Sequence, residues 1–303
     1  MEIIQLTMDT ISSEYNFLGY DGPDYDKSEI VIQQIPYEHT SSYGKGSARG
    51  PASIIEASHY VEFYDEELDR ELCYNHGIAT LKAIDFGNKT DRDALDLIRI
   101  KTKEHLDQNK FVCSLGAEHT VSLGLFEAMR DKYPNVSILQ IDAHSDLRES
   151  YEDNPYSHAS VMARINDYSP QIAQVGIRAQ CKEEAQLIRS SSNILTYYAH
   201  QIDDIAEMSA NIANHLTDEV YITIDADGLD PAIVPGVGTP EPGGLSYHAT
   251  LQILRHICST KTVVGFDIVE CAPIEGQIHS QYVLAKLAYK VMGYCSLNPA
   301  NFG

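Results

Sequence analysis

Two short segments of the sequence place acidic and imidazole side chains at spacings that suit divalent metal ions. Asp142, His144 and Asp146 occupy alternate positions directly after one apolar run. Asp225 and Asp227 follow a second apolar run in the same way. Because residues two apart in an extended chain point to the same side, each segment directs its side chains to one place. Carboxylates with imidazole and without thiolate favour Mn²⁺, with Zn²⁺, Co²⁺ and Fe²⁺ as alternatives, so these segments predict a metal centre.

A third segment adds another imidazole. The apolar run Phe111–Leu115 leads into Gly116 to His119, so three neighbouring strand ends are expected to supply two histidines and four aspartates. One metal ion rarely uses so many side chains while keeping positions open for substrate, whereas two ions that share carboxylates would use them all. Two divalent ions about 3.5–4 Å apart lower the pKa of bound water and generate a hydroxide near neutral pH. The candidate ligands are His119, Asp142, His144, Asp146, Asp225 and Asp227.

The segments that must position these side chains alternate between strand and helix patterns. Several expected strands are apolar on both faces, which is typical of parallel strands covered on both sides. This alternation predicts one α/β domain over residues 1–303 with a mainly parallel sheet, after an irregular lead-in at residues 1–29. The expected strands are Ile30–Ile35, Phe111–Leu115, Val136–Ile141, Ile172–Val175, Ile194–Tyr197, Val220–Ile224 and Thr262–Phe266. The expected helices are Pro51–Tyr60, Asp91–Asn109, Val121–Lys132, Lys182–Ser190, Asp203–Leu216, Tyr247–Cys258 and Gln281–Met292.

The segment Asp225–Leu245 is rich in glycine and proline and follows one of these strand ends. In parallel α/β sheets, ligands bind beyond the carboxyl ends of the strands, which is where the candidate metal ligands lie. The density of glycine and proline predicts a tightly folded loop with positive-φ positions. We expect this loop to form a rigid wall of the active site, with a plain connector as the alternative.

The charge balance narrows the classes of partner. The chain has 303 residues, with 22 Lys and Arg against 44 Asp and Glu, and a net charge of -22. Because nucleic acids and anionic membranes attract basic proteins, neither is an expected partner, whereas metal ions, amines and guanidines fit. Six cysteines without a CxxC pair indicate buried thiols in a reducing compartment. With no signal peptide and no apolar run of about 18 residues, the sequence predicts a cytoplasmic protein.

Five segments together resemble the ureohydrolases, the arginase and agmatinase family. They occur in the order of the family and extend over about residues 30 to 290. The resemblance implies a three-layer α/β/α fold with a mainly parallel central sheet and a centre of two Mn²⁺ ions. It also implies hydrolysis of a guanidinium group to release urea, and a homo-oligomer that is a trimer or a hexamer. The matching segments are Gly116–Thr120, Asp142–Asp146, Ser157–Ser160, Asp225–Leu245 and Phe266–Pro273.

The resemblance further implies catalytic roles for three residues. His158 matches the catalytic histidine of the family, and the ordinary pKa of histidine suits proton exchange at neutral pH; the alternative is that it caps a helix beginning near Ser160. Glu270 matches the glutamate that binds the guanidinium in a planar bidentate pair, and otherwise is an exposed loop acid. Asp146 would accept a hydrogen bond from the attacking hydroxide and pass a proton to the leaving amine.

Five positions depart from the usual family pattern. The first motif reads GAEHT at residues 116–120, where Gly-Gly-Asp-His-Ser is commoner. Glu118 keeps the charge, while Ala117 in place of glycine could shift the loop. Val237 and Cys271 replace a frequent Thr and a frequent small residue. None of these changes removes a candidate ligand, so we expect them to bear on substrate preference rather than on activity.

The acidic segment that follows the second motif bears on the substrate. Glu149, Glu152 and Asp153 would repel a carboxylate and attract an amine, whereas arginases use Ser, Thr and Asn here to hold the substrate carboxylate. The preferred hypothesis is therefore hydrolysis of agmatine to putrescine and urea. Asp153 and Asn154 are the residues expected to bind the small cationic substrate, together with Glu270.

Several alternatives stay open. N1-aminopropylagmatine, arginine and guanidinobutyrate are the other candidate substrates, and an inactive polyamine-binding regulatory protein is the candidate from another class. Arg148 could receive a substrate carboxylate, although a salt bridge to Glu149 or a neighbouring acid is the preferred interpretation. Ser41–Pro51 is interpreted as a rim of the active site, with a subunit contact as the alternative.

Overall fold

Eight strands form the central sheet in the computed structural model, which describes residues 10–302. They are β1 (Ile30–Ile35), β4 (Ile78–Thr80), β5 (Phe111–Gly116), β6 (Ser137–Ile141), β7 (Ile172–Ile177), β8 (Ile194–Tyr198), β9 (Glu219–Asp225) and β10 (Thr262–Val269). From one edge to the other their order is β4-β1-β5-β10-β9-β6-β7-β8, and every neighbouring pair is parallel. All of their carboxyl ends therefore meet at one edge of the sheet.

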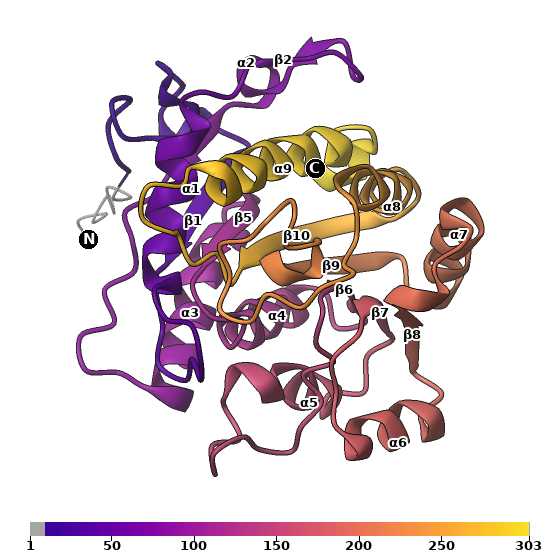
Figure 1. The fold of residues 1–303 in the computed structure, drawn as a ribbon. Coiled ribbons are helices and arrows are strands. Elements are labelled where there is room, and N and C mark those ends of the chain that lie inside the picture. The colour runs from indigo at the N-terminus through magenta and orange to yellow at the C-terminus, as the bar shows by residue number, and fades with distance from the viewer. Residues whose placement is uncertain (1–9, 303) are drawn as a thin grey trace.

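Helices cover both faces of this sheet (Figure 1). They are α1 (Gly50–Ser58), α3 (Asp91–Leu106), α4 (Val121–Lys132), α5 (Val161–Asn166), α6 (Lys182–Ser190), α7 (Ile205–His215), α8 (Tyr247–Thr260) and α9 (His279–Cys295). On one face, α1, α9, α8 and α7 pack side by side in this order, and α3, α4, α5 and α6 cover the other face. This arrangement confirms the predicted α/β/α fold class.

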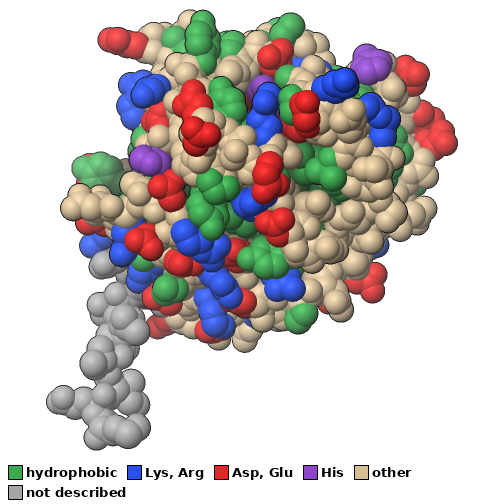
Figure 2. Space-filling view, turned by 90° about the horizontal axis from the view of Figure 1, so that it is seen from below, with side chains coloured by type: hydrophobic (Ala, Val, Ile, Leu, Met, Phe, Trp, Pro, Cys, Tyr) green, Lys and Arg blue, Asp and Glu red, His purple; other side chains and the backbone are tan. Residues whose placement is uncertain are grey.

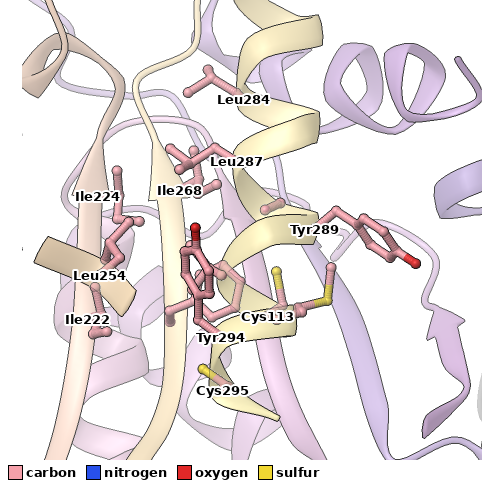
Figure 3. Close-up of a cluster of buried hydrophobic side chains, with 14 of the residues drawn as sticks. Cys113, Ile222, Ile224, Leu254, Ile268, Leu284, Leu287, Tyr289, Tyr294 and Cys295 are labelled. Atoms are coloured by element: carbon pink, nitrogen blue, oxygen red, sulfur yellow. The ribbon is translucent and has the colours of Figure 1, made fainter. Parts of the chain in front are cut away.

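The apolar layer beneath α9 shows how the helices are held on the sheet (Figure 3). Leu284 and Leu287 of α9 lie over Ile224 of β9 and Ile268 of β10, and Leu254 of α8 completes the contact. All five side chains are less than a tenth exposed. Burying each such aliphatic side chain contributes about 1.5–3 kcal/mol, so the middle strands of the sheet are a rigid base for the loops at their carboxyl ends.

All of the predicted strands and helices are present, with ends shifted by a few residues at most. The most consequential shift is in β10, which continues past the predicted end at Phe266 to Val269, so that Glu270 follows the strand directly. The prediction missed β4, α5 and three further short elements, because two to six residues are too few for a clear hydrophobic period. The three further elements are β2 (Tyr64–Asp65), β3 (Arg70–Glu71) and α2 (Leu72–His76).

The described part of the predicted lead-in contains two short 3-10 turns, at Phe17–Gly19 and Tyr25–Lys27, and an isolated bridge from Thr10 to Leu81. Phe17 and Leu18 are nevertheless buried, and their turn contacts α1. Residues 1–9 of that prediction lie outside the described residues.

The surface charges, the helices and the cysteines can each be compared with what the sequence predicted. On the face that Figure 2 shows, Lys and Arg side chains are interspersed with Asp and Glu. Within residues 10–302, no helix combines the length and the hydropathy that a bilayer span requires. All six cysteines are free thiols, and all but Cys181 are buried, as expected from their apolar sequence surroundings.

Candidate metal centre

Four adjacent strands bring the candidate ligands to one edge of the sheet. β5 leads to His119, β10 to Glu270, β9 to Asp225 and β6 to Asp142. Of the three strand ends predicted to be neighbours, those of β9 and β6 are adjacent, whereas β10 lies between β5 and β9 (Figure 1). Glu270 therefore enters the centre between the ligands of the two flanking strands.

The first group of candidate ligands surrounds Nδ1 of His119. Carboxylate oxygens of Asp142 and Asp146 each lie 3.0 Å from this atom, and one of Asp225 lies 3.4 Å away. All four side chains are buried, and Nδ1 has no hydrogen-bond partner among the described residues. An unsatisfied buried polar atom costs about 1–3 kcal/mol. A ring nitrogen left bare among three carboxylates fits a divalent metal ion.

A chain of hydrogen bonds determines which nitrogen of His119 carries the proton. The hydroxyl of Thr223 donates to Oδ1 of Asp267 at 2.7 Å, so it accepts from Nε2 of His119 at 2.9 Å. With the proton on Nε2, Nδ1 presents its lone pair to the carboxylates. Partners of this kind orient metal-binding histidines and fix their tautomer. Burial lowers the pKa of His119, but its contacts with Asp142, Asp146 and Asp225 outweigh burial and raise that pKa well above its ordinary value. A metal ion at Nδ1 would therefore displace a proton.

The second group consists of Asp142, His144 and Asp227. Nδ1 of His144 lies 3.0 Å from Oδ2 of Asp227 and 3.7 Å from Oδ1 of Asp142. Asp142 belongs to both groups, since its Oδ2 faces His119 and its Oδ1 faces His144. One carboxylate placed in this way can bridge two metal ions.

The carboxylates of both groups lack a Lys or Arg partner within the described residues. Burial and the charge of Asp142 raise the pKa of Asp146 to about 6. Burial, Asp227 and Asp142 likewise raise the pKa of Asp225 well above its ordinary value. Burial opposes protonation of His144, but its bonds to Asp142 and Asp227 outweigh burial and raise its pKa to about 12. Without divalent cations the cluster must hold protons, so metal binding would release them.

Two residues of the centre have left-handed backbone conformations, with φ of 52° at Asp146 and 63° at Glu270. For residues other than glycine these conformations cost on the order of 1–3 kcal/mol and persist where other contacts enforce them. The carbonyl of Asp146 accepts hydrogen bonds from Met162 and Ala163, and the backbone N–H of Glu270 donates to Ala117. These contacts hold both strained residues in place.

In the predicted wall Asp225–Leu245, glycine is needed mainly where the backbone passes close to other atoms, and less often for an unusual torsion angle. A Cβ atom on Gly228 would lie 2.8 Å from the backbone nitrogen of Asp142, so only glycine allows the loop to pass the metal-binding segment. Within this loop, only Gly243 has a positive φ, at 77°. The expectation of positive φ therefore holds at one glycine, whereas a glycine such as Gly228 is required because a side chain would collide with a neighbouring segment.

Glu270 lies beside the first group of ligands. One of its carboxylate oxygens accepts a hydrogen bond from the backbone N–H of His119 at 2.7 Å. Burial, followed by the charge of Glu118, raises the pKa of Glu270 to about 8. A neighbouring cation would favour the ionised carboxylate. The position is therefore suited to a carboxylate–guanidinium pair.

His158 is held by Thr40. The hydroxyl oxygen of Thr40 lies 3.1 Å from Nδ1 of His158 and accepts a hydrogen bond from its backbone N–H at 3.0 Å. Burial, followed by the charges of His144 and His119, lowers the pKa of His158 to about 4, so the ordinary histidine pKa expected from the sequence does not hold without bound metal, and the ring is neutral at pH 7. The side chain does not cap α5, so the alternative interpretation of His158 as a helix cap is wrong. Its Nε2 has no partner among the described residues.

Members of both ligand groups, together with His158 and Glu270, line one cavity of about 300 Å³, whereas the fully buried Asp142 is not among the lining residues. This volume is at the lower end for small-molecule sites, which fits a small linear compound. The rim of the cavity is formed by residues from several loops, among them Ser41, Tyr43, Arg148, Tyr151, Thr239 and Glu241.

Comparison with known proteins agrees with this geometry. The sequence profile of the Arginase family matches residues 28–293. The chain belongs to the arginase family. It is 40% identical to an N(1)-aminopropylagmatine ureohydrolase of Synechocystis sp. over 276 residues, which cover 89% of this chain and 90% of that protein. It is 39% identical to an agmatinase of Bacillus cereus over 259 residues, which cover 83% of this chain and 86% of the other.

The fold of this ureohydrolase also matches a solved structure, the agmatine ureohydrolase of Thermoplasma volcanium. The TM-score is 0.82 at 28% sequence identity, and the match covers 97% of this chain and 96% of that one. The family resemblance expected from the motifs is thereby confirmed. This ureohydrolase is an enzyme that hydrolyses guanidino groups, and arginase-family enzymes depend on two metal ions, which agrees with the two ligand groups.

In this ureohydrolase, the segment expected to bind the substrate amine turns away from the cavity. Neither Asp153 nor Asn154 is among the residues that line it. Asp153 is exposed, and Nδ2 of Asn154 donates to Oδ1 of Asp91 at 2.7 Å. The reason is a tight turn from Tyr151 to Asn154, in which Glu152 and Asp153 both have positive φ.

Arg148 does line the cavity, but its partners differ from those expected. Its Nε lies 3.9 Å from a carboxylate oxygen of Glu184, and its guanidinium carbon lies 5.6 Å from the ring centre of Tyr151. Glu149 instead pairs with Arg164 at 2.9 Å. A neighbouring acid does engage Arg148, as preferred, but it comes from α6 and not from the same loop.

Sequence reasoning missed three residues of the site. The expected rim Ser41–Pro51 does supply Ser41, Ser42, Tyr43 and Gly44 to the cavity, although Tyr43 had not been singled out. Thr40 precedes that segment and had no motif of its own. Glu241 lies within the predicted wall, where only glycine and proline had drawn attention.

Proposed function

We propose that this ureohydrolase cleaves agmatine to putrescine and urea with the help of two Mn²⁺ ions. The observation that carries the proposal is that Glu270 shares one cavity with two carboxylate–imidazole groups joined by Asp142. Two divalent ions bound there would supply a hydroxide nucleophile near neutral pH. A guanidinium paired with Glu270 lies beside both groups.

The donor set supports manganese. It combines carboxylates with imidazole and contains no thiolate, a composition that suits Mn²⁺. The bare Nδ1 of buried His119 supports a metal there, since no protein group satisfies it. In this proposal one ion is held by His119, Asp142, Asp146 and Asp225, and the other by Asp142, His144 and Asp227.

Three residues perform the remaining chemistry in this proposal. Glu270 binds the guanidinium through a planar, charge-assisted pair and orients its carbon. Asp146 accepts a hydrogen bond from the nucleophile, takes its proton and returns it to the leaving amine. His158 exchanges protons with solvent through Nε2, which its contact with Thr40 leaves free.

The rim favours an amine at the other end of the substrate. Glu241 lines the cavity, and its carboxylate makes no hydrogen bond or ion pair within the described residues, so its charge is available to an ammonium group. Arg148, which could have received the carboxylate of arginine, is engaged by Glu184. We therefore assign to Glu241 the role in binding the amine that had been expected of Asp153 and Asn154.

The second candidate substrate is N1-aminopropylagmatine. A relative that is 40% identical over most of both chains bears the name of that activity. The rim also offers aromatic surface to a longer diamine tail, since Tyr43 is 82% exposed and Tyr151 lies on the same cavity.

The test is release of urea by the Mn²⁺-loaded enzyme from agmatine, N1-aminopropylagmatine, arginine and guanidinobutyrate. We expect the highest kcat/KM with agmatine, and both amine-tailed compounds should exceed the two carboxylates. Turnover of arginine alone would overturn the amine-tailed proposal, and a clear preference for N1-aminopropylagmatine would replace agmatine as the substrate. If a metal-loaded protein released urea from none of them, the polyamine-binding alternative would stand.

We also propose that the chain forms one domain and assembles as a homo-oligomer, a trimer or a hexamer. Exposed apolar side chains cluster where α1 ends and α9 begins, at Tyr60, Ile278 and Tyr282, and the hydroxyl of Tyr282 lies 3.4 Å from the carbonyl of Tyr60. Light scattering during size-exclusion chromatography checks the number of subunits, and a monomer would contradict the proposal.

A further inference from the structure

The side chain of Thr40 contacts His158 at two points, although the two residues are far apart in the sequence. Its hydroxyl oxygen accepts the backbone N–H of His158 at 3.0 Å and lies 3.1 Å from Nδ1 of the ring. On another side, the ring of Tyr151 meets the imidazole edge-on, with 5.6 Å between ring centres. The imidazole is therefore held by a hydroxyl and an aromatic ring.

The hydroxyl of Thr40 occupies Nδ1 of His158. A threonine hydroxyl has one proton to donate and two lone pairs. One lone pair receives the backbone N–H of His158, so the second lone pair or the hydroxyl proton meets Nδ1. In either case Nδ1 is engaged. Since Nε2 has no partner among the described residues and the residue lines the cavity, Nε2 is the ring atom left for proton exchange.

Thr40 is itself anchored to the strand end that carries the first metal group. The fully buried carboxylate of Glu118 accepts backbone hydrogen bonds from Thr40 at 2.7 Å and from His39 at 2.9 Å. Glu38 closes the same loop by accepting from the backbone N–H groups of Gly46 and Ala48. Glu118 immediately precedes His119, so one rigid connection joins the metal centre to the hydroxyl that holds His158.

We propose that Thr40 is a positioning residue, which occupies Nδ1 of His158 and keeps Nε2 of the imidazole turned into the cavity. This inference rests on the proposed function, because it assigns the proton exchange to His158. It also gives the buried acid at position 118 a role, since its carboxylate holds the loop that carries the hydroxyl.

The test compares Thr40→Val with Thr40→Ser. Valine removes the hydroxyl and keeps the shape and the backbone bond to Glu118, whereas serine keeps the hydroxyl. We expect Thr40→Val to lower kcat by roughly 10- to 100-fold, part of what a general acid or base contributes, with KM changed less than about threefold. Thr40→Ser should restore kcat to within about threefold. A full kcat in Thr40→Val would overturn the proposal.

Two further measurements separate positioning from a general structural effect. In a His158→Asn background, Thr40→Val should cause no additional loss of kcat, because the residue acts only through the ring; an equal loss in both backgrounds would contradict the proposal. Metal content and thermal midpoint of Thr40→Val, measured by elemental analysis and calorimetry, should stay close to those of the parent, and loss of metal would also contradict it.

A spectroscopic readout keeps the inference distinct from the activity. In ¹⁵N-histidine-labelled protein, the Nδ1 resonance of His158, assigned by its absence in His158→Asn, should have the shift of a hydrogen-bonded ring nitrogen. In Thr40→Val this resonance should move. If the parent releases no urea from any guanidine but shows this change, the proposed function fails and the positioning stands. If urea is released and the Nδ1 resonance does not move, the positioning fails alone.

Discussion

Two groups of carboxylates lie at different places in this molecule and are neutralised in different ways. In the first, buried Asp65 and the more exposed Glu67 of the β2–β3 hairpin contact Nζ of Lys290 at 3.0 and 2.8 Å, and Glu67 is also bound by Tyr294 and Arg255. In the second, at the carboxyl ends of the strands, the carboxylates are buried, and within the described residues imidazoles are the only side chains that form ion pairs with them.

This difference distinguishes a structural group of ion pairs from a candidate metal centre. Burial alone would lower the pKa of Lys290, but its bonds to Glu67 and Asp65 outweigh burial and raise that pKa, so the hairpin supplies its own counter-charge. The metal centre has no such cation, and the pKa of Asp225 is raised because burial and neighbouring carboxylates disfavour its charge. A buried acidic cluster without lysine or arginine requires charge from outside the chain.

The largest effect is expected from Asp142→Asn, because this carboxylate belongs to both ligand groups. We expect activity to fall by about 10⁴-fold or more, since removal of the metals removes the nucleophile. Elemental analysis should show loss of both ions. Asp227→Asn is the matched control and should lose mainly one ion. Full metal content in Asp142→Asn would contradict the proposal that metal ions neutralise this cluster, in contrast to the hairpin.

Lys290→Met tests the ion-pair group of the hairpin, in which the chain supplies its own positive charge. Removing one partner of a buried ion pair leaves an unpaired charge and costs about 3–5 kcal/mol. We expect the free energy of unfolding, measured with denaturant, to fall by this amount, while kcat of the folded, metal-loaded enzyme stays within about twofold. A chelator should lower the thermal midpoint of parent and variant equally. If the chelator had no effect on the parent, the counter-charge argument for the metal centre would be wrong.

Glu270→Gln separates substrate binding from metal binding at the same edge of the sheet. Replacing the carboxylate by an amide removes the charge-assisted pair with the guanidinium, and we expect kcat/KM to fall by about 100-fold. Metal content should be unchanged, since Glu270 binds the backbone of His119 and belongs to neither ligand group. Loss of metal in this variant would show that it is a ligand instead.

The smallest effect concerns a buried imidazole without carboxylate contacts. Burial lowers the pKa of His105 to about 4, and its Nδ1 lies 2.8 Å from the hydroxyl of Tyr25, whereas carboxylates raise the pKa of His144 to about 12. His105 binds its proton more weakly in the folded state than in the unfolded state. Its contribution to the free energy of unfolding is therefore complete above about pH 6.5 and is lost as the pH falls toward 4. Between pH 7 and 4.5 the free energy of unfolding should fall by roughly 2 kcal/mol.

Unfolding titrations at pH 7 and pH 4.5 test whether protonation of His105 lowers the free energy of unfolding. His105→Gln should flatten the pH dependence by about the same amount, and His59→Gln, on a partly exposed imidazole, serves as a control that should leave it unchanged. A parent protein whose stability rose on acidification over this range would contradict the assignment.

Much of the site could be predicted from local spacing. Asp142, His144 and Asp146 come directly after a buried strand, so their place at the carboxyl edge of the sheet follows from the chain itself, whereas the left-handed backbone at Asp146 does not. Asp153 and Asn154 were misplaced for a reason that is also local: their carboxylate and amide suited an amine, but left-handed residues in a tight turn point the segment elsewhere. Residue chemistry was visible in the sequence, and the direction of the turn was not.

By itself the sequence determined the alternation of strands and helices, the parallel sheet and the set of candidate ligands, because these depend on hydrophobic period and on residue type. Only the tertiary structure decided that β10 lies between β5 and β9, that Thr40 reaches His158, and that Glu241 lines the cavity. These contacts join residues that are distant along the chain. Their formation depends on how strands pair and loops pack, which no local pattern of residues records.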